Sequence, residues 1–293
     1  MGFDLAAKPF SLPRCCFVAV RQWRVACFVI VALSLTLALT VPFLPLADPP
    51  ESNLDARLLP PLAPEHVLGT DALRRDVLSR IVWGVRPVLI QGLVAVAIAA
   101  VLGYFVGAIP GFWGGNVDTF VMRPVDALLA IPPVMMAIAV AATLGPGLTN
   151  AVIAMTIVMI APIARVARGA VLQTKHRDYI LAARSVGVPS IRILLRHVVP
   201  NTVTPVLAYA LPLIGIMIVF GSGLSFIGFG IQPPTPDWGR MVNEGRTVLA
   251  TSPFVPTFPS FAIFLLGLGF ILVGDWLENL LDPHATSTRP DPW

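Results

Sequence analysis

Six long stretches of the chain carry almost no charged residues, and each is about long enough to cross a membrane. A membrane helix needs about 20 predominantly apolar residues, because its backbone polar groups must find their partners within the helix. The pattern predicts six spans, near residues 25–46, 88–111, 125–143, 148–164, 202–223 and 256–274. We therefore expect an all-α, polytopic membrane protein with about six transmembrane helices.

The composition supports this class of protein and argues against others. Of the 293 residues, 56% are hydrophobic and 12% are charged, whereas soluble domains carry about 25% charged residues. A soluble fold could not hide that much apolar surface. The formal charge of +4 does not indicate nucleic acid as a partner, because the basic residues lie beside apolar runs. Cys15, Cys16 and Cys27 have no CxxC spacing, so no metal site is expected.

The distribution of Lys and Arg predicts the orientation and the division of the chain. The loops on the side of the N-terminus hold more of them, so both termini are expected in the cytoplasm. We expect a cytoplasmic segment at 1–24, a first span with an outer segment at 25–87, a core of five spans at 88–283 and a cytoplasmic tail at 284–293. In the outer segment, apolar residues at helical spacing predict a separate amphipathic helix on the outer surface: Val77, Leu78, Ile81 and Val82. The Pro-rich outer segment is either a contact surface for an external partner or a structural cover.

The spans lack the residues that a catalyst or a proton pathway would need. Asp126 stands at a span entrance, where an ion pair with Arg123 at i,i+3 explains it. Neither lysine, Lys8 or Lys175, follows a Gly-rich phosphate loop. Ser222 has no histidine in any span to serve as its base. We expect no enzyme activity and no cofactor in this chain, so energy for uphill transport must come from another subunit.

The most informative region is the inner loop at 165–201. Residues 178–186 read as a helix, Gly187-Val188-Pro189 breaks it, and Ser190 is expected to cap a second helix. That second helix has an apolar face and a basic edge, formed by Ile191, Leu194, Leu195 and Val198 and by Arg192 and Arg196 respectively. The residues alone leave the partner of this hairpin open between lipid headgroups and another protein.

The stretch YILAARSVGVPSIRILLRHVVPN, at 179–201, resembles the cytoplasmic EAA loop of ABC-importer permeases. The positions that match the family's pattern are Ala182, Ala183, Gly187, Val198 and Pro200. Leu181 stands where the family usually has Glu, which implies that the hairpin couples to its partner by packing rather than by a salt bridge at that position.

Other segments resemble the C-type subunit of the dipeptide and oligopeptide permease family. They are HVLGTDALRRDVLSRIVWGVRP, GFWGGNVDTFVMRPVDALLAIPP, LSFIGFGIQPPTPDWG and GDWLENLLDP, with Arg74 near a place where Gly is usual. The resemblance implies the type I ABC importer permease fold in a bacterial inner membrane. It also implies a homologous B-type permease subunit, two P-loop ATPase subunits that use ATP and Mg, and an extracytoplasmic substrate-binding protein as partners.

Two groups of functional residues follow from the resemblance. The ATPase-coupling group, in which Pro200 is expected to end the second helix, comprises Tyr179, Leu181, Ala182, Ala183, Gly187, Arg192, His197 and Pro200. The group at the outer mouth, expected to contact the binding protein, comprises Asp71, Arg75, Asp76, Gln232, Pro233, Pro234, Asp237 and Trp238. The implied solutes are dipeptides and oligopeptides, with a metal chelate, glutathione or a heme-like ligand as alternatives. A secondary peptide transporter is the rival class, and it would need buried carboxylates.

Overall fold

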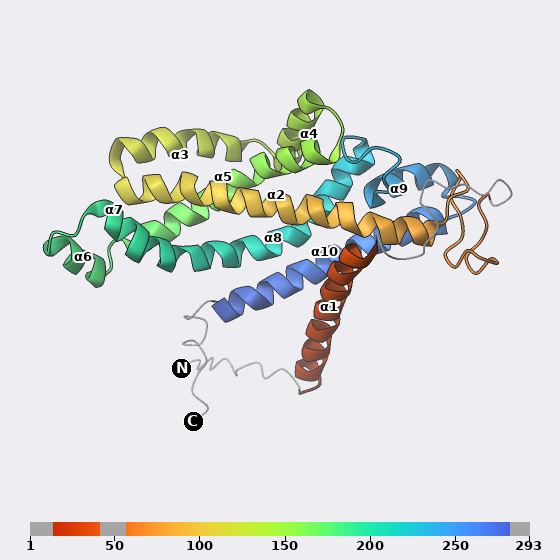
Figure 1. Cartoon of the computed structure of the whole chain (residues 1–293), viewed down its shortest axis with the longest axis horizontal. Helices are drawn as coiled ribbons and strands as arrows, with labels where there is room; N and C mark the ends of the chain where they lie inside the picture. Colours follow the sequence, from red (N-terminus) through yellow and green to blue (C-terminus); the bar gives the residue numbers. More distant parts are fainter. Residues whose placement is uncertain (1–13, 42–56, 282–293) are drawn as a thin grey trace, which may run out of the picture.

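A computed structural model describes residues 14–41 and 57–281 (Figure 1). These residues form helices, apart from the non-helical segment at 57–76 and the shorter connections. The predicted tail at 284–293, residues 1–13 of the predicted N-terminal segment and residues 42–46 of the first predicted span lie outside the described residues. The helices are α1 (Arg14–Thr40), α2 (Val77–Trp113), α3 (Gly115–Ala130), α4 (Pro133–Leu144), α5 (Leu148–Thr174), α6 (Asp178–Ser185), α7 (Ser190–Ile193), α8 (Val199–Ile227), α9 (Trp238–Gly245) and α10 (Phe254–Leu281).

Within the described residues, four helices are long and apolar enough to cross a membrane. They are α2, α5, α10 and a continuous helix, Ser190–Ile227, that joins α7 to α8. The apolar part of α1, Val25–Thr40, is shorter than a typical span. The all-α membrane fold is therefore confirmed, with four clear spans in place of the predicted six and a fifth if α3 and α4 are counted together.

The predicted span at 125–143 is broken. The axes of α3 and α4 differ in direction by 98°. The break lies at Ile131 and Pro132, which precede the first residue of α4, Pro133. A residue before proline is pushed out of the helical region, so two successive prolines stop α3 and begin α4. The predicted span is therefore either one sharply bent span or a re-entrant loop, and hydropathy alone did not show the bend that these prolines cause.

The predicted surface helix at 77–82 is the beginning of α2. Asp76 caps this helix, because its carboxylate accepts the Ser79 backbone N–H at 2.7 Å. Opposite sides of the first turns are covered, since Val77 is 0% exposed and Ser79, two residues further on, is 2% exposed. The helix then runs on through Pro87 as one element of 37 residues.

Three glycines at intervals of four residues hold α2 against α5. A Cβ on Gly107 would overlap the carbonyl oxygen of Ala164, and one on Gly103 would lie 2.9 Å from that of Ile160. Gly111 faces the next turn of α5 at Arg168. Such rows of small residues let helix backbones approach closely in membranes, where apolar burial drives association little.

The long helices α2, α5 and α8 lie along the long axis of the molecule (Figure 1). A buried hydrogen bond of 2.7 Å between the hydroxyls of Tyr104 and Thr202 joins α2 to α8. The α6–α7 hairpin lies at one end of this bundle and α9 at the other, whereas α1 and α10 pack along one side (Figure 1). The two candidate sites from the sequence are therefore at opposite ends.

Candidate functional site

The hairpin turns at Gly187, as the sequence predicted. Gly187 has a φ of +79°, a conformation that glycine adopts without strain. Its N–H donates to Arg184 O at 3.0 Å, and the N–H of Val188 donates to Ala183 O at 3.1 Å. This pair of bonds closes the C-terminus of α6 and turns the chain toward α7. A side chain at Gly187 would meet open space, so the backbone conformation alone demands glycine here.

The rest of the predicted loop is more helical than expected. α5 continues nine residues beyond Arg165, and Pro189 rather than Ser190 occupies the N-cap of α7. Pro200 does not end the second helix, because it lies in the first turn of α8 within the continuous helix. A π turn at Leu194–Val198 precedes it. Proline clashes with the carbonyl four residues earlier, and this wider turn lets the helix pass it without a break.

Polar contacts fasten the base of the hairpin to the bundle. Lys175 donates to the carbonyl of Gly111 at 2.8 Å, next to the C-terminus of α2. Arg168 on α5 donates two hydrogen bonds to the carboxylate of Asp118 on α3, at 2.6 and 2.5 Å. Asp126 also pairs with α5, at 2.6 Å from Arg165, so the predicted pairing with Arg123 was wrong. The end of α5 that leads into the hairpin is therefore fixed by polar contacts with α2 and α3.

Two buried isoleucines, Ile180 and Ile193, pin the hairpin to the core, and the opposite surface is exposed. The exposed apolar side chains are Tyr179, Leu181, Val186, Ile191 and Leu195. The exposed arginines beside them are Arg177, Arg184, Arg192 and Arg196. Of the remaining predicted coupling residues, Ala182 and Pro200 are exposed, whereas Ala183 and His197 are half-buried. Six of the eight predicted coupling residues are thus exposed, and we call the exposed surface of the hairpin the hairpin face.

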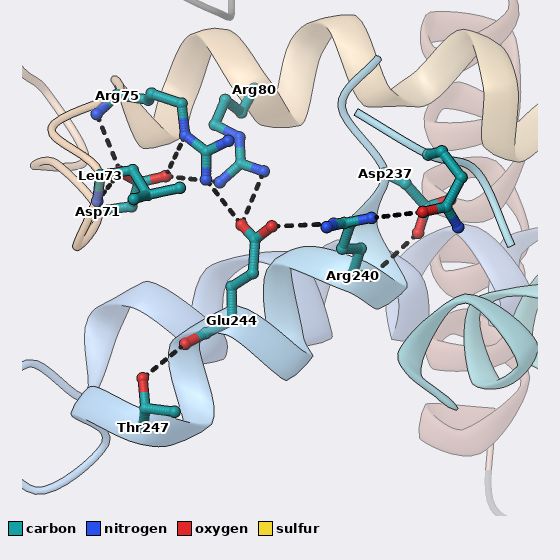
Figure 2. Close-up of polar contacts among 9 residues, drawn as sticks. Asp71, Leu73, Arg75, Arg80, Asp237, Arg240, Glu244 and Thr247 are labelled. Atoms are coloured by element: carbon teal, nitrogen blue, oxygen red, sulfur yellow. Dashed lines mark hydrogen bonds and ion pairs between the residues drawn. The ribbon is translucent and has the colours of Figure 1, made fainter. Parts of the chain in front are cut away.

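A cluster of charges lies at the other end of the bundle, between the segment before α2 and helix α9 (Figure 2). Arg80 donates to Asp71 at 2.6 Å and to Glu244 at 3.1 Å. Arg75 donates to the same two carboxylates, at 2.8 and 2.7 Å. Arg240 completes the chain of contacts by donating to Glu244 at 3.0 Å. We call these five residues the charge cluster.

Helix α9 begins at a buried carboxylate next to this cluster. Asp237, 0% exposed, accepts the backbone N–H of Arg240 at 2.9 Å and the hydroxyl of Ser225 at 3.2 Å. Burial raises the pKa of Asp237 to about 6, against the effect of these hydrogen bonds. Burial also opposes ionisation of Glu244, but the surrounding arginines, Arg80 first, outweigh it and lower the pKa of Glu244.

Several members of the predicted outer contact group are buried in this structure. Asp71, Asp237 and Trp238 are each no more than 3% exposed, so they offer no surface to a second protein in this structure. Trp238 instead donates to the carbonyl of Ile81 at 2.9 Å and packs on Gly84.

The other members of the predicted outer contact group are of two kinds: three make contacts within the chain, and two are exposed. Asp76 caps α2 and binds His66 at 2.9 Å, and Arg75 belongs to the charge cluster. Gln232 accepts from Arg240 at 3.0 Å. Pro233 and Pro234 are exposed at the tip of their loop and remain available for contact. Sequence reasoning missed the i,i+4 pair of Arg240 and Glu244, which its spacing could have indicated. It also missed the contact of Arg80 with Glu244, because no local signal links positions 164 residues apart.

Comparison with known proteins shows the family to which the chain belongs. Residues 99–287 match the family described as "Binding-protein-dependent transport system inner membrane component". The chain is 45% identical over 219 residues to the glutathione transport system permease protein GsiD of Escherichia coli O6:K15:H31 (strain 536 / UPEC), covering 75% of this chain and 72% of that protein. The same values hold for GsiD of Shigella boydii serotype 4 (strain Sb227).

Two solved structures share the fold. An amino acid ABC transporter crystallised with histidines gives a TM-score of 0.55 at 18% identity, over 69% of this chain and 94% of that one. The MetNI methionine ABC transporter, in an inward-facing conformation, gives 0.53 at 16% identity, over 70% and 96%. The fold is that of type I ABC importer permeases. With the match over residues 99–287, the chain belongs to the family of binding-protein-dependent transport system inner membrane components and is the permease component of an ABC importer.

Proposed function

We propose that this permease carries short peptides, including glutathione, and that its hairpin face receives the movement of an ATPase subunit. The solute class joins two lines of support: the resemblance to dipeptide and oligopeptide permeases, and relatives at 45% identity that are named as glutathione permeases. Glutathione is itself a tripeptide, so one class of solute covers both. The coupling role is carried by one observation, the exposure of the hairpin face beyond the apolar part of the bundle.

The reach of the hairpin favours a protein over lipid as its partner. Thr174 lies ten residues beyond Ala164, the last residue before a charge on α5, which is about 15 Å at 1.5 Å per residue. The headgroup layer of one leaflet is only about 5–8 Å thick. Helix α5 therefore carries the hairpin past the headgroups and toward the space where an ATPase subunit would bind.

The coupling proposal is tested by adding bulk to the hairpin face without straining its turn. Ala182 is exposed on α6, so Ala182→Trp leaves the fold intact and fills the space that a partner would occupy. We expect solute-stimulated ATP hydrolysis to be lost in the reconstituted importer. Gln173→Trp, exposed on α5 before the hairpin, is the matched control and should retain coupling. Full coupling in the Ala182→Trp importer would refute this role for the hairpin.

The solute is tested separately. Uptake of labelled glutathione and of a labelled dipeptide is measured in vesicles that contain the importer with its cognate binding protein. A melting-temperature shift of that binding protein reports which of the two it binds. We expect uptake of at least one of them, and uptake of neither would remove the peptide class while leaving the permease assignment intact.

A further inference from the structure

We infer that the surface which receives the hairpin carries carboxylates that pair with Arg192 and Arg196, so that the cleft of the ATPase subunit is acidic beside its apolar floor. This inference rests on the proposed coupling role. It moves the electrostatic contact away from position 181, where Leu181 offers no charge.

The exposed side of the second hairpin helix presents two parallel rows. Ile191 and Leu195 form an apolar row and are 54% and 61% exposed. Arg192 and Arg196 form the adjacent row and are also exposed. Residues four apart lie about 5–6 Å from each other on one helix face, so each row is a compact pair. A partner that packs on the apolar row must therefore also meet the two guanidinium groups.

The charge of the hairpin is almost entirely positive. Its exposed arginines, Arg177, Arg184, Arg192 and Arg196, are accompanied by a single carboxylate, Asp178. Arg184 lies over the ring of Phe112, with its guanidinium carbon 5.8 Å from the ring centroid, so part of that charge is directed back toward the bundle. The rest faces outward.

Among the described residues, Arg192 and Arg196 have no carboxylate partner, whereas several other arginines do. Among residues 57–281, Arg75, Arg80, Arg165, Arg168 and Arg240 each form an ion pair. In the same part of the chain no carboxylate lies within ion-pair distance of Arg192 or Arg196. Exposed to water, these two charges need no partner. Within a protein cleft they lose hydration, and burial without a partner is strongly unfavourable for each of them. Carboxylates in the cleft would pair with these guanidinium groups and so offset the lost hydration.

The experiment uses the complete permease pair in nanodiscs of zwitterionic lipid, titrated with its cognate ATPase subunits at several salt concentrations. In Arg192→Glu/Arg196→Glu, repulsion replaces attraction, and we expect affinity for the ATPase subunits to fall about tenfold or more. Arg192→Lys/Arg196→Lys keeps the charge and should stay near wild type. Wild-type affinity should decrease with salt, and the Glu variant should lose this dependence. Arg246→Glu, an exposed reversal at the opposite end of the bundle, controls for net charge.

The outcomes separate this inference from the coupling role. If the Glu variant binds like wild type while Ala182→Trp still abolishes coupling, the hairpin docks without acidic partners and the inference is wrong. If binding changes only when anionic lipid is added to the nanodiscs, the arginines face the membrane and the inference is equally wrong. If neither variant alters binding or coupling, the coupling role itself fails.

Discussion

The guanidinium of Arg80 donates to the carboxylate of Glu244 at 3.1 Å, although 164 residues separate them in the chain. The same guanidinium binds Asp71 at 2.6 Å, so one side chain joins the segment before α2 to helix α9. With Arg75 and Arg240, the charge cluster holds three arginines between two shared carboxylates. The end of the molecule opposite the hairpin is thus fixed by electrostatic contacts in a partly dry environment, where each charge depends on the others.

Removing Arg80 should destabilise the protein strongly. Arg80→Leu leaves Asp71 buried at 3% exposure with one guanidinium fewer, and breaking a buried ion pair costs about 3–5 kcal/mol. We expect a clear decrease in the melting temperature of the purified protein in detergent. Arg86→Leu changes an exposed arginine of the same helix and is the control. Equal shifts for the two variants would show that the charge cluster contributes little.

The buried carboxyl of Asp237 predicts a pH dependence of stability. Its pKa is 3.8 as an ordinary carboxyl and about 6 in the folded protein, so between these values the folded chain binds more protons than the unfolded one. The contribution of this group to stability is therefore fully present below about pH 4 and is lost as pH rises to about 6. Asp237→Asn lacks this titration and still caps α9. Its melting temperature should rise relative to wild type from pH 4 to pH 6, and a constant difference over that range would contradict the shifted pKa.

The contact between α2 and α5 predicts intolerance to a single methyl group. Gly107→Ala places a Cβ onto the carbonyl oxygen of Ala164, so the two backbones must separate. Gly169→Ala adds the same methyl group on α5, where nothing lies within 4 Å. We expect the first variant to lose stability by about 1–3 kcal/mol, as overpacked sites do, and the second to lose none. Thermal unfolding in detergent compares them, and indistinguishable melting curves would exclude close packing at Gly107.

A buried amide in the bundle predicts a stabilising substitution. Gln91 is 1% exposed beside Gly221, and neither its Nε2 nor its Oε1 has a hydrogen-bond partner among the described residues. An unsatisfied buried polar group costs about 1–3 kcal/mol. Gln91→Leu should therefore raise the melting temperature. Thr202→Val, which removes the bonded hydroxyl partner of Tyr104, should lower it. A lower melting temperature for Gln91→Leu would show that the amide is satisfied.

One turn before α2 predicts a second stabilising change. Arg74 has a φ of +67°, which costs a residue with a side chain about 1–2 kcal/mol. This conformation explains why a glycine is usual near this position in the family that the sequence resembles. Arg74→Gly should increase stability by roughly 0.5–1 kcal/mol, after the entropy that glycine loses on folding is subtracted. Leu73→Gly, the neighbouring residue with an ordinary φ, should decrease it. The two melting temperatures should move in opposite directions, and parallel shifts would contradict the strain at Arg74.

Sequence reasoning succeeded where a local pattern determines the structure. Apolar runs located the long helices, and Gly187 between a helix and a proline located the hairpin turn. It failed where proline has two outcomes: Pro132 stops a helix, whereas Pro87 and Pro200 lie within continuous ones. Tertiary packing decides between these outcomes, because neighbouring helices compensate for a missing backbone bond.

The charge cluster was beyond prediction for a different reason. Asp71 and Glu244 meet only after α2 and α9 have packed, and the pattern around Arg80 read equally well as the polar face of a surface helix. The sequence showed the basic edge of the hairpin. Only the structure shows that no described carboxylate lies within ion-pair distance of Arg192 and Arg196.

The continuous helix from Ser190 to Ile227 connects the two ends of the molecule directly. Its 38 residues extend about 57 Å, from the hairpin turn to the loop that Asp237 ties down through Ser225. A rod of this length that tilts by about 5° about one end displaces the other by about 5 Å. A small rotation imposed at the hairpin therefore becomes a displacement of atomic size beside α9, to the extent that the helix stays straight at Pro200, Pro205 and Pro212.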